Sequence, residues 1–239
     1  MHPIILKFGG TSLGSAERIH SAASLVAERL KHHPVVVTSA MSQVTNLLIA
    51  TAEAALKKDE KNVRENLAIL REKHFAAAKT KPVRREIETL LNELAQLMEG
   101  IKMLGELTPR SLDFVCSFGE RMSSWLMIEA LEKLGMKTQR VDSRNLVRTD
   151  NQFGSAEVEW KTTQSQIAKA LNPVIGKGII PVVTGYIGST KDGETTTLGR
   201  GGSDYSAAIL GVCLDASEIQ IWTDVDGMMT CDPRLIPHA

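Results

Sequence analysis

Two glycine-rich segments hold the side chains of this chain that are best suited to phosphate chemistry. The first, Lys7-Phe8-Gly9-Gly10-Thr11-Ser12, directly follows an apolar run, and the second, Thr197-Leu198-Gly199-Arg200-Gly201-Gly202-Ser203-Asp204, directly precedes one. Glycine lets backbone amides approach phosphate oxygens without interference from a Cβ atom, and the N-terminus of a following helix favours an anion. Lys7 could offset charge that develops on a transferring phosphoryl group. These residues therefore indicate phosphoryl transfer.

The spacing of the glycines excludes the commonest phosphate-binding motifs. No Gly-x-x-x-x-Gly-Lys-Ser/Thr sequence occurs, so the chain has no Walker A loop. The glycines are also wrongly spaced for a dinucleotide fingerprint and for the loop of a protein kinase. The pattern predicts a phosphotransferase of another fold.

Composition excludes several other classes of protein. The 239 residues are 43% hydrophobic, and 28 Lys and Arg balance 28 Asp and Glu, so no net field attracts nucleic acid or an anionic membrane. The three cysteines are far apart and predict neither a disulfide framework nor a zinc site. With no signal-peptide pattern and no apolar run long enough to span a bilayer, we expect a cytoplasmic protein.

Short apolar runs alternate with helical patterns along most of the chain. We predict strands at 4–8, 35–37, 138–141, 179–184 and 218–223, and a β-hairpin at 185–198. Helices are predicted from a Ser15 cap through Leu30, from Met122 to Leu134, and from Lys161 to Leu171 before Asn172-Pro173. The alternation favours right-handed parallel crossovers. We therefore expect an α/β fold, a three-layer α/β/α sandwich with a mainly parallel central sheet.

One stretch interrupts this alternation. Residues 50–107 are rich in Ala, Leu, Glu and Lys and contain no strand pattern, so they predict a helical insertion. Thr80-Lys81-Pro82 would divide it into two antiparallel helices, and Thr108-Pro109 would begin a fresh helix. The insertion could serve as a lid or an interface, or have no functional role.

Five segments in fixed order extend the two glycine loops into a family resemblance. The segments are Lys7 to Ser12, Ser39-Ala40-Met41 leading to Thr45-Asn46, Gly119 to Ser123, Gly199 to Asp204, and Thr223 to Gly227. Together they resemble the catalytic domain of the aspartate kinases, members of the amino-acid kinase family. The resemblance covers essentially all of residues 1–239. It implies ATP-dependent phosphorylation of the β-carboxylate of L-aspartate, with Mg²⁺ on the nucleotide, at the start of lysine, threonine, methionine and isoleucine biosynthesis.

The resemblance also implies roles for individual residues. Catalytic roles fall on Lys7, which would contact the transferring phosphoryl group, and on Asp204, which would organise the site. Aspartate-binding roles fall on Arg200 for the α-carboxylate, Glu120 for the α-ammonium, and Thr45, Tyr186 and Ser203 around them. Nucleotide-binding roles fall on Gly9, Gly10, Ser39, Thr223, Asp224, Met229 and Arg234. No residue is expected to ligate a metal ion directly.

Some alternatives remain open at this stage. From spacing alone, Glu120 could be an exposed acid in the first turn of a helix, a role worth about 0.3 to 1 kcal/mol. Met229 replaces an aromatic residue of many family members, and Ala239 precedes the family's later nucleotide-binding lysine and its regulatory domains. The chain could thus act on glutamate, acetylglutamate or carbamate, or be a truncated fragment that binds ligands without catalysis. A homodimer is also compatible with the sequence.

Overall fold

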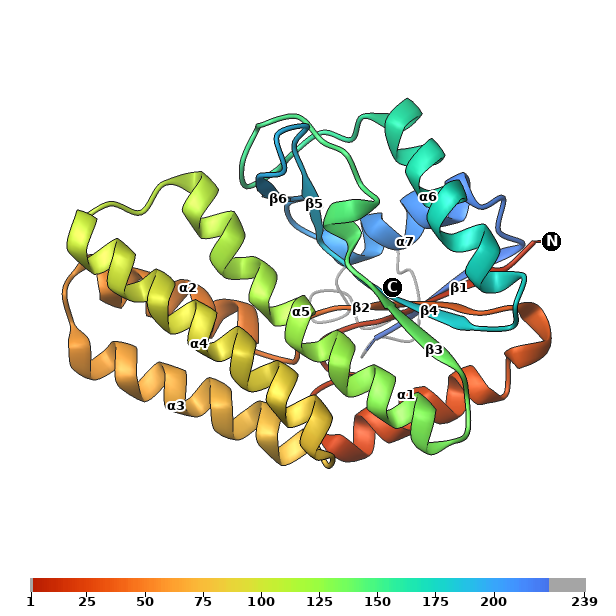
Figure 1. Ribbon diagram of the computed structural model, residues 1–239, viewed down its shortest axis with the longest axis horizontal. Helices are drawn as coiled ribbons and strands as arrows, with labels where there is room; N and C mark the ends of the chain where they lie inside the picture. Colours follow the sequence, from red (N-terminus) through yellow and green to blue (C-terminus); the bar gives the residue numbers. More distant parts are fainter. Residues whose placement is uncertain (1, 224–239) are drawn as a thin grey trace, which may run out of the picture.

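A strand–helix–strand unit begins the central sheet. The computed structural model describes residues 2–223 (Figure 1). Every residue of β1 (Ile4–Phe8) is buried, and this strand pairs in parallel with β2 (Val35–Thr38). Between them lies α1 (Ala16–Ala27), whose first turn is capped by Ser15, because the Ser15 side chain accepts a hydrogen bond of 3.3 Å from the Arg18 N–H.

The sheet places four strand ends side by side. Its described strands are all parallel, in the order β3-β4-β2-β1-β7. Phe8 of β1 is level with Thr38 of β2 and Trp222 of β7 (Glu218–Trp222), and Thr38 is level with Thr184 of β4 (Ile180–Thr184). Loops that leave these ends therefore meet at one edge of the sheet, which is where open α/β sheets bind ligands.

The remaining elements follow the predicted alternation. They are α2 (Val44–Leu56), α3 (Glu60–Ala77), α4 (Lys81–Leu104), α5 (Pro109–Lys133), β3 (Thr138–Val141), α6 (Trp160–Ile175), β5 (Ile187–Ser189), β6 (Thr195–Thr197) and α7 (Gly202–Cys213), with short 3-10 turns at Leu30–His32 and Ser143–Asn145. Strands β5 and β6 form the predicted hairpin.

Alternation along the strands divides the core into two layers. Leu6 and Phe8 of β1 face the helices α1 to α5, whereas Ile5 faces α6 and α7. Because side chains alternate between the two faces along a strand, Lys7 lies on the same face of the sheet as Ile5. The predicted three-layer sandwich is confirmed, with α1 and α5 on one side of the sheet and α6 and α7 on the other (Figure 1).

Several predicted helix boundaries were wrong. The helix after Ser15 ends at Ala27, so Leu30 lies in a 3-10 turn and is exposed. The helix predicted to begin at Thr108-Pro109 does so, with Thr108 as its N-cap, but it continues through Gly119 to Lys133, so no separate helix begins at Met122. Helix α6 continues beyond Pro173 and ends at Ile175. Residues 50–107 are helical as predicted and break at 78–80, but a second break at 57–59 separates α2 from α3.

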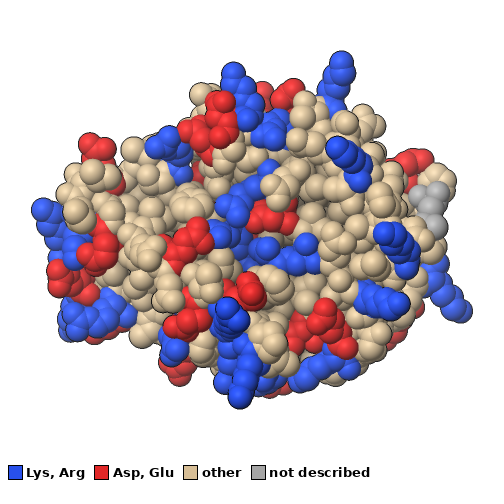
Figure 2. Space-filling view, viewed as in Figure 1, with Lys and Arg blue, Asp and Glu red and all other residues tan. Residues whose placement is uncertain are grey.

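Basic and acidic side chains are interspersed among uncharged ones on the face seen in Figure 2, and neither sign of charge covers it. Across residues 2–223, none of the helices is both long and apolar enough to cross a membrane.

Candidate active site

A cavity of about 460 Å³ lies over the carboxyl ends of the central strands. Its walls come from segments far apart in the sequence: β1 and the loop after it, the β2–α2 loop, the middle of α5, the turn between β4 and β5, and the glycine-rich start of α7. The structure thereby gathers nine of the predicted site residues around one cavity: Lys7, Gly10, Ser39, Thr45, Glu120, Tyr186, Arg200, Ser203 and Asp204.

Lys7 forms the floor of this cavity together with Asp204. The Lys7 side chain is 8% exposed, and its Nζ lies 2.6 Å from Asp204 Oδ1 in the first turn of α7. A buried ammonium needs such a partner because its desolvation is costly. Gly9 adjoins the pair, since a Cβ atom at Gly9 would lie 3.4 Å from Lys7 Nζ. Asp204 thus fixes the direction in which the Lys7 charge points.

Glu120 reaches the cavity because α5 passes unusually close to the β2–α2 loop. A Cβ atom at Gly119 would lie 2.6 Å from the Ala40 Cβ, so only glycine allows this approach. The carboxylate of Glu120 follows directly, in the interior of α5, where the residue is 3% exposed. The alternative of an exposed acid in a first turn is therefore wrong, because this helix begins eleven residues earlier, at Pro109.

The carboxylate of Glu120 is electrostatically unsatisfied. Its Oε2 is buried without a hydrogen-bond partner among the described residues. Burial raises the pKa of Glu120 to about 8, although the backbone amide of Ala40 lowers it in part. A buried, unpartnered carboxylate is costly unless a cation or donor reaches it. This arrangement suits the ammonium group of a ligand bound in the cavity.

A positively charged side chain also lines the cavity. Arg200 is exposed, and within residues 2–223 its guanidinium forms no hydrogen bond or ion pair. Ser203 lies near the N-terminus of α7, and Thr45 lies in the first turn of α2. A free guanidinium can bind a carboxylate through two parallel hydrogen bonds, and hydroxyl groups that line the same cavity can add further ones. The cavity thus presents the carboxyl group of Glu120 and the guanidinium of Arg200, which together suit a ligand with both an ammonium and a carboxylate group.

Tyr186 also lines the cavity and packs on the start of α7. Its φ is +70°, a strained value for a residue with a side chain, and its N–H donates to Ser206 Oγ at 2.8 Å. A Cβ atom at Gly202 would lie 2.6 Å from Tyr186 Cδ2, so the ring packs directly on the start of α7. Local strain of this kind is common where a side chain is aimed at a ligand.

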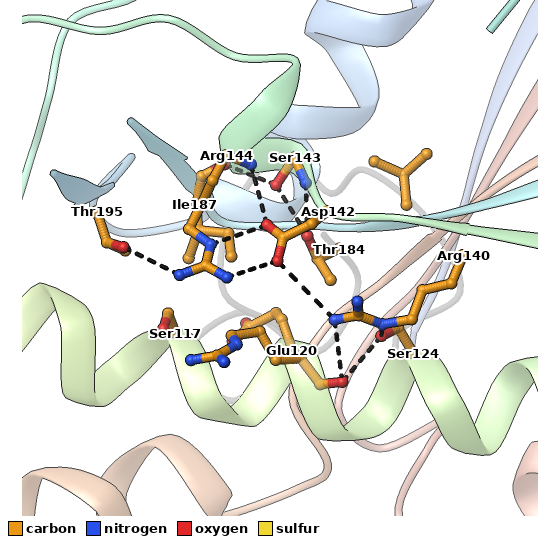
Figure 3. Close-up of polar contacts among 12 residues, drawn as sticks. Ser117, Glu120, Ser124, Arg140, Asp142, Ser143, Arg144, Thr184, Ile187 and Thr195 are labelled. Carbon is orange, nitrogen blue, oxygen red and sulfur yellow. Dashed lines mark hydrogen bonds and ion pairs between the residues drawn. The ribbon is translucent and has the colours of Figure 1, made fainter. Parts of the chain in front are cut away.

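A network of arginines supports the site from the β3 side (Figure 3). Arg144 makes two hydrogen bonds to Asp142, at 2.7 and 2.9 Å, and one to Thr195 of β6. Arg140 lies 4.0 Å from Asp142 and donates to Ser124 Oγ of α5 at 2.8 Å. Burial opposes ionisation of Asp142, but the hydrogen bonds and charge of Arg144 outweigh it and lower the pKa. The network joins the hairpin to α5.

Not every predicted residue lies on this cavity. Thr223 borders a separate cavity with Phe8 and Trp222, although its Oγ1 would lie 3.5 Å from a Cβ atom at Gly9. The positions of Asp224, Met229 and Arg234 lie outside the described residues.

Three lining residues lie outside the five segments that carry the family resemblance. Ser42, Gln43 and Gly154 also line the main cavity. Ser42 and Gln43 lie between two predicted site residues, Ser39 and Thr45, and could have been found from that position. Gly154 lies in a loop far from any recognised motif, and no local pattern in the sequence marks it.

Comparison with known proteins places the chain in a family. Residues 2–239 match the model of the family described as "Amino acid kinase family". The chain belongs to the amino acid kinase family. It is 40% identical over 242 residues to Aspartokinase 2, chloroplastic, of Arabidopsis thaliana, covering 98% of this chain and 44% of that protein. It is 38% identical over 240 residues to Lysine-sensitive aspartokinase 3 of Escherichia coli, covering 99% of this chain and 52% of that protein.

A solved structure of this family has the same fold. The crystal structure of E. coli aspartokinase III in complex with aspartate and ADP superposes with a TM-score of 0.91 at 37% identity, covering 98% of this chain and 52% of that one. The 239 residues thus span about half the length of these relatives.

Proposed function

We propose that residues 1–239 form the catalytic domain of an aspartate kinase that transfers the γ-phosphoryl group of ATP to the β-carboxylate of L-aspartate. The products would be 4-phospho-L-aspartate and ADP, supplying aspartate-derived amino-acid biosynthesis. The helical insertion belongs to the same domain, since α2 and α4 pack on the shared core. The aspartokinase relatives and the complex of one of them with aspartate and ADP support this proposal.

The observation that supports it most directly is the buried, unpartnered oxygen of Glu120. An acceptor with a free ammonium would satisfy this oxygen, whereas one with a blocked amine would leave it unpaired. Arg200, which lines the same cavity, suits the α-carboxylate of the same molecule. The pair therefore favours an α-amino acid over acetylglutamate or carbamate.

Lys7 suits the transfer step. The side-chain carboxylate of aspartate is already ionised at neutral pH, so its oxygen can attack the γ-phosphorus without a general base. The bond from the γ-phosphorus to the bridging oxygen of ADP breaks, and negative charge accumulates on that oxygen. Lys7 would offset this charge from the cavity floor, held in position by Asp204. Gly9 and Gly10 would leave room for phosphate beside it.

Mg²⁺ would be held mainly by the nucleotide. Among the described residues, no group of three or more His, Cys, Asp or Glu side chains could bind a metal ion. Asp204, beside Lys7, is the protein carboxylate placed to contact a metal ion on the phosphates. When bound, the ion would neutralise phosphate charge during transfer.

Coupled measurement of ADP release tests the function. We expect turnover with aspartate, weaker turnover with succinate, which lacks the amine, and none above background with N-acetylaspartate. Glu120→Gln should lower kcat/KM for aspartate by a factor that corresponds to about 1.5 to 3 kcal/mol, and should leave kcat/KM for succinate nearly unchanged. Preference for glutamate or acetylglutamate would assign another amino-acid kinase activity. Binding of aspartate without turnover would assign a ligand-binding fragment.

A further inference from the structure

Asp113 is a buried carboxylate on α5 that none of the proposed catalytic steps uses. The residue is 3% exposed, and its oxygens accept three hydrogen bonds. Oδ2 accepts from the Gly154 N–H at 2.9 Å and the Thr197 N–H at 2.8 Å, and Oδ1 accepts from Thr197 Oγ1 at 2.8 Å. One side chain therefore joins three segments: α5, the loop that contains Gly154, and β6.

Both segments bound by Asp113 lead to the acceptor cavity. Gly154 itself lines the cavity, and Thr197 is the last residue of β6, three positions before Arg200. The two segments also contact each other, because a Cβ atom at Gly199 would lie 2.9 Å from Ser155 Oγ. The position of the segment that carries Arg200 thus depends on the Asp113 carboxylate.

Glu120 lies on the same helix as Asp113. The two acids are seven residues apart, so they lie on one face of α5, separated by about 10 Å along the helix axis. Asp113 holds the segment that carries the free guanidinium, and Glu120 supplies the unpartnered carboxylate. The distance between the two charges of the acceptor site is therefore set through α5.

We propose that Asp113 is a positioning residue that fixes the spacing between Glu120 and Arg200, and thereby matches the site to the α-ammonium and α-carboxylate of one acceptor. This inference rests on the proposed function. Loss of the Asp113 contacts lets the Gly199–Arg200 segment move relative to α5, so both α-groups of the acceptor can no longer be bound at once. The cavity floor at Lys7 is held separately by Asp204 and keeps its geometry.

The chain provides a matched control on the same helix. Glu129 of α5 is also buried, at 6% exposed, and it also accepts two backbone N–H groups, from Lys79 and Thr80 at the start of α4. It borders a different cavity and does not line the acceptor cavity. Glu129→Gln therefore measures the cost of altering a buried carboxylate clamp without disturbing the acceptor site.

Steady-state kinetics of four variants test the proposal. Asp113→Ala removes all three contacts, Asp113→Asn keeps the shape and part of the hydrogen bonding, and Thr197→Val removes the hydroxyl contact with Asp113 but keeps the backbone one. We expect the KM for aspartate to rise about tenfold or more in Asp113→Ala, and less in Asp113→Asn and Thr197→Val. The KM for ATP should change less than twofold, and Glu129→Gln should leave both constants unchanged. An unaltered KM for aspartate in the Asp113 variants, or an equal rise in Glu129→Gln, would overturn the proposal.

Hydrogen exchange provides a second readout that needs no activity. In Asp113→Asn, the amides of Gly154 and Thr197 should exchange faster than in the parent protein, while those of Lys79 and Thr80 stay protected. Failure of the proposed function would give a different result, because the parent protein itself would then release no ADP in response to aspartate. If the exchange of Gly154 and Thr197 is unchanged, Asp113 does not hold these segments and the proposal fails, even if Asp113→Ala does not fold.

Discussion

Lys7 Nζ and Asp204 Oδ1 lie 2.6 Å apart, and the two side chains differ sharply in exposure, at 8% and 52%. Lys7 lies near the end of β1 and is buried, whereas Asp204 lies in the first turn of α7 and is about half exposed. Asp204 therefore has carboxylate surface that solvent or a ligand can reach, while Lys7 is restricted to the cavity floor. A charge fixed in this way stabilises a transition state without a cost of reorganisation.

Replacement of Lys7 should affect turnover more than binding. We expect Lys7→Ala to lower kcat by a factor that corresponds to about 2.7 to 4 kcal/mol, with a much smaller change in the KM for aspartate. Steady-state kinetics with saturating ATP measure both constants. Lys177→Ala, an exposed lysine after α6, is the control and should behave like the parent protein. Near-normal turnover in Lys7→Ala would remove this lysine from the mechanism.

Binding of aspartate at neutral pH should release protons. Because burial raises the pKa of Glu120 to about 8, this carboxyl is mostly protonated at pH 7 in the free protein, and an ammonium ligand favours its ionised form. Titration calorimetry at pH 7 in buffers of different ionisation enthalpy should detect up to one proton released per aspartate bound. The release should disappear in Glu120→Gln and should be absent with succinate. Equal proton release by Glu120→Gln would assign the proton to another group.

Prediction from sequence succeeded where the information was local. The buried strand before Lys7, the Ser15 cap and the hairpin around Asp192-Gly193 all depend on neighbouring residues, and the structure has each of them. The glycine loops of the site also adjoin elements that were predicted locally, since Gly9 and Gly10 directly follow β1 and Gly201 directly precedes α7.

Prediction failed where a residue's role depends on distant partners. A helix was predicted to begin at Met122, but Gly119 already lies inside α5, where the backbone comes close to Ala40. Asp113 had no recognisable signal, since its partners Gly154 and Thr197 lie 41 and 84 residues away. Contacts of this kind arise only from the folded topology, which a local pattern does not contain.

A buried histidine in the helical insertion should make stability depend on pH. His74 of α3 donates from Nδ1 to the Leu70 carbonyl at 2.7 Å, and its Nε2 is buried without a partner among the described residues. Burial lowers the pKa of His74 from 6.5 to about 4. The folded state therefore binds fewer protons than the unfolded state between these values. The stability it contributes is present above pH 6.5 and is lost as the pH falls toward 4.

Chemical denaturation at several pH values measures this effect. The free energy of unfolding of the parent protein, relative to that of His74→Leu, should fall by at most about 1.4 kcal/mol per pH unit between pH 6.5 and 4. Glu120 changes stability with pH in the opposite direction, because its raised pKa makes the folded state bind more protons than the unfolded state between about pH 4.5 and 8. The comparison with His74→Leu cancels that contribution. Replacement of the exposed His20 by glutamine controls for the loss of a histidine from the surface of the protein.

Two helical glycines should respond in opposite ways to the same substitution. A Cβ atom at Gly119 of α5 would lie 2.6 Å from the Ala40 Cβ, whereas one at Gly100 of α4 would have no heavy atom within 4 Å. We expect Gly100→Ala to stabilise the protein by about 0.4 to 1 kcal/mol, because alanine lowers the entropy of the unfolded chain and favours helix. Gly119→Ala should instead destabilise it by about 1 to 3 kcal/mol, because α5 must move away from the β2–α2 loop.

The functional consequence should follow the same division. Movement of α5 at residue 119 displaces Glu120 from the acceptor cavity, so Gly119→Ala should raise the KM for aspartate while Gly100→Ala leaves it unchanged. Thermal unfolding and steady-state kinetics of the two variants measure both effects. If Gly119→Ala is as stable and as active as Gly100→Ala, the close approach of α5 to Ala40 is not what places Glu120 in the cavity.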